Sequence, residues 1–231
     1  MRLFLILAIL ALAVTTAFPR GLGAQDVGAR LDARVAPAVR SAVQDIAADA
    51  AARGLPTEPL VEKAIEGGAK RVPSERLIAA VRALAARLGE AADAVRAGGI
   101  ASPAAEVVEG GADGLSAGLS AAQVTDLVRA SHQGYEPALV LRVAATLAAL
   151  GVPASQTVQL VEGMMSAGRT PGDLLGLPGD VQAGVASGST PAQAAAGLAR
   201  AAGGTPPGRT PGWVPPGQTN PHRPPPNPHK P

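Results

Sequence analysis

The sequence predicts an all-α protein, either an irregular helical bundle or a short array of αα-hairpin repeats, followed by a disordered, proline-rich C-terminal tail. The segment 54–88 carries two amphipathic patterns joined at a proline. In its first half, apolar residues recur at the spacing of one helical face, and Glu58, Glu62, Glu66 and Lys70 line another. Two apolar faces so close in sequence can cover each other by folding back as a helical hairpin.

The first 24 residues have the features of an export signal. Arg2 precedes an unbroken apolar run, residues 3–14, which at about 12 residues fits a signal peptide and falls short of the roughly 20 needed to span a bilayer. Cleavage after Ala24 or after Ala17 suits the small residues there. We therefore expect an exported protein, periplasmic or extracellular; the alternative is an inner-membrane protein that keeps residues 3–14 as an anchor.

Composition narrows the class of partner. The predicted helical domain, residues 25–204, has 15 basic and 18 acidic residues, a net charge of −3, and Tyr135 as its one aromatic residue. Nucleic-acid binders usually present a basic face with interspersed aromatics, so this class is disfavoured. The chain has no cysteine, which excludes disulfide partners and lipoprotein-type acylation.

Proline, glycine and capping residues divide the domain into about eight expected helices. The apolar stripe beginning near Val27 runs, with a kink or restart at Pro37, to a glycine at 54. Thr57 is a plausible N-cap for the next helix, and a long helix is expected from Ser74 to Ala97. Further helices are expected to begin after Ser102-Pro103, at Ser120, at Pro137, after Val152-Pro153, at Thr170 and at Thr190.

Three of these starts carry the pattern of a capping box, in which an N-cap hydroxyl and a side chain three residues later satisfy each other's backbone N–H groups. Ser120 and Thr190 are each followed by a glutamine at that spacing, and Thr170 by an aspartate. Pro171 and Pro191 occupy the first helical position, which needs no N–H. From residue 205 the sequence turns proline-rich and is predicted to be disordered, with a polyproline II bias.

A degenerate repeat is suggested by segments that start near residues 54, 99 and 151, at intervals of 45 and 52 residues, and each reach a Glu-Gly pair. Coincidence in an alanine-rich sequence is an equal alternative. Two adjacent glycines inside a helix cost about 2 kcal/mol relative to alanines, so they predict a helix end or a close helix crossing. The residues assigned to structural turns are Gly54, Gly67, Gly68, Pro73, Gly99, Gly110, Gly111, Gly151 and Gly163.

The sequence offers few residues suited to a catalytic or metal-binding role. Glu58, Glu62 and Glu66 are expected to form a solvated helix face, with Glu66 placed to pair with Lys70. His132 is expected near a helix end, and we predict no cofactor, metal or catalytic residue. The alternative is an envelope glycan-cleaving hydrolase that uses a lone glutamate as its acid, for which the candidates are Glu66, Glu109 and Glu162.

The favoured prediction is a non-enzymatic helical interaction or scaffolding module of a bacterial cell envelope. Its partner would be an envelope polymer or an envelope protein. The tail has three basic residues and no acid, so it could associate with anionic polymer in a salt-sensitive way. The tail residues predicted to make contact are Arg209, Trp213, Arg223 and Lys230.

Overall fold

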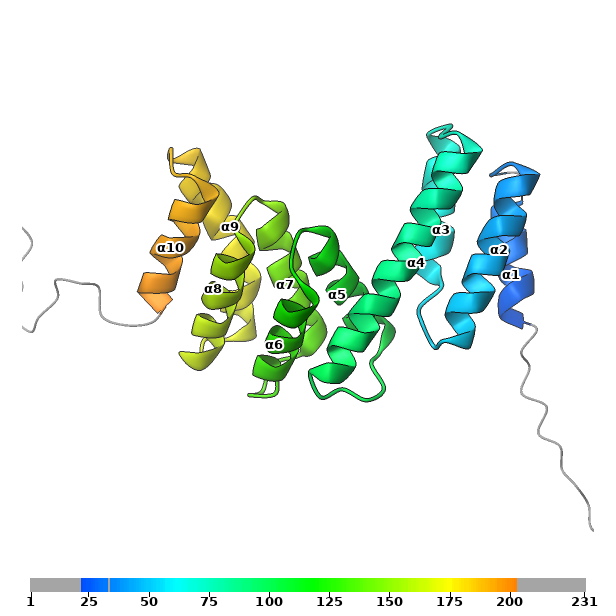
Figure 1. The fold of residues 1–231 in the computed structure, drawn as a ribbon. Helices are drawn as coiled ribbons and strands as arrows, with labels where there is room; N and C mark the ends of the chain where they lie inside the picture. Colours follow the sequence, from blue (N-terminus) through cyan, green and yellow to red (C-terminus); the bar gives the residue numbers. More distant parts are fainter. Residues whose placement is uncertain (1–21, 33, 203–231) are drawn as a thin grey trace, which may run out of the picture. The chain divides into compact units, whose positions relative to one another are not determined.

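The structure, a computed structural model, describes residues 22–32 and 34–202 (Figure 1). This part of the chain forms ten α-helices and no strand, which confirms the predicted all-α class. It divides into two compact units. The N-terminal unit comprises the described residues up to 53 together with 57–83, and the C-terminal unit comprises 54–56 and the described residues from 84 on.

The N-terminal unit contains three helices and the start of a fourth, which lie side by side in Figure 1. Their inward faces carry small and branched apolar residues, and no described aromatic side chain contributes. The helices are α1 (Leu22–Leu31), α2 (Pro37–Ala52), α3 (Glu58–Ala69) and the first part of α4 (Ser74–Ala97). The fully or nearly fully buried residues include Leu31, Val39, Val43, Leu60, Val61, Ala64, Leu77 and Val81.

The C-terminal unit is a two-row helical array that follows the end of α4. Each helix packs on the next but one along the chain, so α5, α7 and α9 form one row and α6, α8 and α10 the other (Figure 1). Leucine and valine side chains between the rows build one continuous core. The helices are α5 (Ala105–Ser116), α6 (Ala121–Ser131), α7 (Pro137–Ala149), α8 (Ala154–Ser166), α9 (Pro171–Ala186) and α10 (Pro191–Ala202).

Glycines in the left-handed region end most of the helices. After α7, for example, Gly151 has φ +90°, and the N–H of Val152 donates to the carbonyl of Leu147 at 3.1 Å. This 6→1 bond is the signature of a Schellman motif, which an L-residue with a side chain adopts only with strain. Positive-φ glycines occur at Gly54, Gly99, Gly118, Gly134, Gly151, Gly168 and Gly188.

The predicted capping boxes form. In α6 the N–H of Ser120 donates to the side chain of Gln123 at 2.9 Å, and the Ser120 hydroxyl accepts from the Gln123 N–H at 3.3 Å. Thr170 and its aspartate form the same reciprocal pair at α9, as does Thr190 with its glutamine at α10. The helix starts read from these residues are therefore confirmed.

The turn assignment of five glycines is wrong. Gly54, Gly99 and Gly151 do follow helix ends, and Pro73 lies in the corner before α4. The Glu-Gly pairs, in contrast, lie inside helices, and at four of their glycines an added Cβ would be crowded by a neighbouring group. The five in helices are Gly67 and Gly68 in α3, Gly110 and Gly111 in α5, and Gly163 in α8.

The segments that start near residues 54, 99 and 151 are not equivalent steps of one array. Two helices, α3 and α4, lie between the first two starts, whereas three helices, α5 to α7, lie between the second and third. A hairpin repeat must advance by an even number of helices. The regular step in the C-terminal unit is instead a single helix, since the glycines at 118, 134, 151 and 168 follow one another at 16 or 17 residues.

No described helix is both long enough and apolar enough to cross a bilayer. Residues 3–14, the alternative anchor, lie outside the described residues, as do the tail candidates Arg209, Trp213, Arg223 and Lys230.

Candidate functional site

A cavity of about 490 Å³ lies at one end of the N-terminal unit, where the α1–α2 connection, the first turns of α2 and the α3–α4 corner meet. Three of its lining residues are arginines that come from these three segments: Arg34, Arg40 and Arg71. We call it the arginine cavity. The remaining lining residues are Val35, Ala36, Pro37, Val39, Gly68, Val72, Ser74 and Leu77.

Arg40 is the inner member of the three. Its side chain is 34% exposed, and its Nη1 pairs with Asp32 Oδ1 at 2.7 Å. Its Nε is buried and has no hydrogen-bond partner within the described residues. A buried donor without an acceptor is uncommon in proteins. Arg40 therefore retains unused donor capacity beside the cavity.

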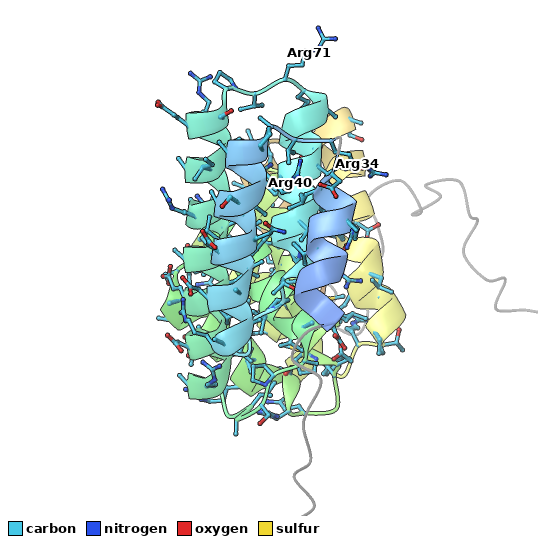
Figure 2. The ribbon with its side chains drawn as sticks, turned by 90° about the vertical axis from the view of Figure 1, so that its right-hand side faces the viewer. Arg34, Arg40 and Arg71 are labelled. Atoms are coloured by element: carbon cyan, nitrogen blue, oxygen red, sulfur yellow. The ribbon has the colours of Figure 1, made fainter. Side chains whose placement is uncertain are left out.

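Arg34 and Arg71 form the rim. Figure 2 shows Arg40 between the helices, Arg34 toward the side of the unit and Arg71 projecting from the α3–α4 corner. Both rim residues are exposed. Neither makes an ion pair or a side-chain hydrogen bond in the described part of the chain, so their five-donor guanidinium groups are available to a ligand.

The backbone of Arg71 is unusual. Its φ is +54°, the one positive value at a described residue other than glycine. The N–H of Val72 donates to the carbonyl of Gly67 at 2.9 Å, which places Arg71 at the Schellman position that glycine occupies after α5, α7, α8 and α9. The left-handed conformation costs an L-residue about 1 kcal/mol or more, so α3 ends with an arginine at the expense of stability.

The Gly67-Gly68 pair allows the chain segments around the cavity to come together. A Cβ on Gly67 would collide with the side chain of Leu77, which is buried. A Cβ on Gly68 would lie 2.8 Å from Val35 Cγ1 and closer still to the carbonyl oxygen of Arg34. The first Glu-Gly-Gly motif thus allows the α1–α2 connection, which carries Arg34, to lie against α3.

The glutamates considered as lone acids lie in three different environments. Glu66 accepts hydrogen bonds from Lys70 and Lys63, which hold its pKa below the usual value, so it is suited to an ion pair and not to proton donation. Glu109 is half-buried on α5. Burial raises the pKa of Glu162, and the nearby carboxylate of Asp126 raises it further.

Glu162 and Asp126 line a second cavity of about 360 Å³ in the C-terminal unit. Because the folded state holds a proton on Glu162 more tightly than the unfolded chain does, stability should fall as pH rises from the ordinary glutamate pKa through the raised value. We expect Glu162→Gln to unfold at higher urea concentration than the parent at pH 7. The two should converge near pH 4, where both side chains are neutral.

The control is Glu62→Gln, which alters an exposed glutamate on α3. Equal urea midpoints for Glu162→Gln and the parent at pH 7 would show that the folded protein does not disfavour the ionised form of Glu162.

Compared with protein-family models, curated proteins and solved structures, the chain matches none.

The arginine cavity could not be predicted from the sequence, and Arg34, Arg40 and Arg71 are not among the candidate residues named above. One signal was present, since the end of α3 carries arginine where neighbouring helices end in glycine. The convergence of three segments could not be inferred, because it depends on the packing of α3 against the α1–α2 connection.

Proposed function

We propose that the chain is a non-enzymatic interaction module of the cell envelope, exported by its N-terminal signal, which holds an anionic group of an envelope partner in the arginine cavity. The observation that carries this proposal is the set of three arginines around one cavity, of which one, Arg40, is paired with a carboxylate, that of Asp32. Residues 25–83, which include all of the cavity residues, contain 9 basic and 8 acidic residues, so general basicity does not account for the set.

The lining chemistry favours binding over catalysis. Arginine keeps its charge at all physiological pH values and donates hydrogen bonds without accepting them. Apart from the three arginines, the lining includes one hydroxyl, on Ser74, and otherwise apolar residues or glycine. A proton-transferring group of the kind used in acid–base catalysis is not among these lining residues. The basic tail residues would provide a second, salt-sensitive contact in the same proposal.

Co-sedimentation tests this function. The chain from Gln25 onward is mixed with isolated cell-wall sacculi and with anionic vesicles, beside a version that ends at Gly204. A third version changes Arg34, Arg40 and Arg71 to glutamine. We expect the arginine variant to lose most of its pelleting at low salt, and 0.5 M salt to release the parent protein.

The matched control changes Arg53, Arg82 and Arg87 to glutamine, which removes the same charge from exposed residues that do not line the cavity. Equal pelleting of the two triple variants would reject the cavity as the binding site. Pelleting lost only on tail removal would assign the contact to the tail.

A glycan-cleaving hydrolase is the second candidate, supported by Glu162 and Asp126 at one cavity and by the raised pKa of Glu162. A carboxyl group whose pKa is raised, beside a second carboxyl group, is the arrangement of an acid catalyst and its partner. Solubilisation of sacculi by the parent protein but not by Glu162→Gln would favour this enzyme. Intact-mass measurement of the mature N-terminus tests the separate alternative of a retained anchor.

A further inference from the structure

We infer that the arginine cavity takes a phosphomonoester group, such as that of a phosphorylated sugar. This inference rests on the proposed function, because it names the anion that the site would hold.

Charge is the first argument. Arg34, Arg40 and Arg71 contribute three positive charges, and the Asp32 carboxylate paired with Arg40 offsets one. The remaining charge of +2 matches a phosphomonoester, which carries between 1.5 and 2 negative charges at about pH 7. A carboxylate would leave one guanidinium uncompensated.

The directions of the donors are the second argument. A carboxylate is planar and can be satisfied by one arginine through two parallel hydrogen bonds. Here the guanidinium groups come from three chain segments, with Arg40 between the helices and Arg34 and Arg71 at the rim (Figure 2). A tetrahedral phosphate has three terminal oxygens that can accept from such separated donors. One of these oxygens would also supply the acceptor that the buried Nε of Arg40 lacks.

The start of α2 adds backbone donors to the same site. Ala36 precedes the helix and makes no side-chain cap, and Pro37 occupies its first position. Both residues and Val39 line the cavity, so the free amide end of α2, where anions are favoured, belongs to the wall. Ser74, the first residue of α4, also lines the cavity and carries a hydroxyl group.

The retained strain at Arg71 is the third argument. Backbone strain of this kind is kept where function requires it, and arginine supplies a bidentate donor that glycine would not. The volume of about 490 Å³ falls in the range of small-ligand sites. It leaves room beside the phosphate for an organic group the size of a sugar.

The test compares two sugars that differ in the anion at the same carbon. Full-length protein is titrated calorimetrically with glucose 6-phosphate and with glucuronate. We expect glucose 6-phosphate to bind about 10-fold or more tightly than glucuronate, since each charge-assisted hydrogen bond contributes about a factor of 10. Arg40→Gln and Arg71→Gln should each weaken phosphate binding about 10-fold, whereas Arg87→Gln, an exposed control on α4, should leave it unchanged.

Arg71 is exposed, so Arg71→Gln should fold even if Arg40→Gln does not; far-UV circular dichroism checks both. Equal affinity for the two sugars, no binding of glucose 6-phosphate, or binding that ignores both arginines would overturn the inference. Vesicles containing phosphatidic acid present the same group on a lipid. Binding to them as well as to the sugar phosphate would place the source at a membrane surface, and binding to the sugar phosphate alone would indicate a soluble ligand.

The envelope function and the phosphomonoester site can be rejected independently of each other. Arginine-dependent pelleting with sacculi, without preference for glucose 6-phosphate over glucuronate, would retain the envelope module and reject the phosphomonoester. Selective binding of glucose 6-phosphate, without any pelleting, would retain the phosphate site and reject the envelope function.

Discussion

Replacing Gly68 with alanine should destabilise the N-terminal unit by about 2 kcal/mol. The new Cβ would collide with the carbonyl oxygen of Arg34 and would lie 2.8 Å from Val35 Cγ1. Because the first contact is to backbone, the α1–α2 connection must shift, and overpacking of this kind costs about 1–3 kcal/mol. The helix propensity of alanine returns up to about 1 kcal/mol. Urea unfolding followed by circular dichroism measures the difference.

Gly163→Ala is the matched control, since it changes the glycine of the third Glu-Gly pair. Gly163 also lies inside a helix, but no atom lies within 4 Å of its ideal Cβ position. Alanine there should gain about 0.5–1 kcal/mol. Hydrogen exchange should show faster opening of α1–α3 in Gly68→Ala and no such change in Gly163→Ala. Two variants of equal stability would show that the α1–α2 connection does not approach α3 closely.

These glycines illustrate what the sequence could and could not predict. Because glycine destabilises a helix interior, the pairs predicted either a helix end or a close approach of another segment. In α3 and α5 the glycines allow a close approach. Gly111 approaches Ala91 of α4, with 3.1 Å between its ideal Cβ and that of the alanine. Gly163 has the same local sequence and no such neighbour. The identity of a residue facing a glycine is a property of tertiary packing, which a motif does not contain.

Helix limits were more predictable than helix packing, for a physical reason. A capping box or a left-handed glycine is satisfied within a few residues, so Ser120, Thr170 and Gly151 could be assigned locally. The long helix from Ser74 to Ala97 was predicted despite an internal glycine and is present. The two rows of the C-terminal unit depend on contacts between alternate helices. The suggested repeat was a two-helix hairpin, whereas the regular step in this unit is a single helix.

Replacing Arg71 with glycine should stabilise the N-terminal unit while it weakens phosphate binding. Glycine adopts the left-handed conformation without the strain that an arginine bears at φ +54°. We expect a gain of about 1 kcal/mol, reduced slightly by the lost attraction between an exposed cation and the α3 dipole. Affinity for glucose 6-phosphate should fall about 10-fold, because the rim loses one charge-assisted donor. Urea unfolding and calorimetric titration measure the two effects on one sample.

Two controls separate strain from charge. Lys70→Gly changes the neighbouring residue, whose φ is −80° and whose ammonium pairs with Glu66; without strain to relieve, it should destabilise. Arg71→Lys keeps the charge and the strain but loses the bidentate fork, so its stability should match the parent and its affinity should be intermediate. If Arg71→Gly lost stability and kept its affinity, the arginine would serve the end of α3 and not a ligand. Opposite changes in stability and affinity are what a residue retained for binding, at a cost in folding, must show.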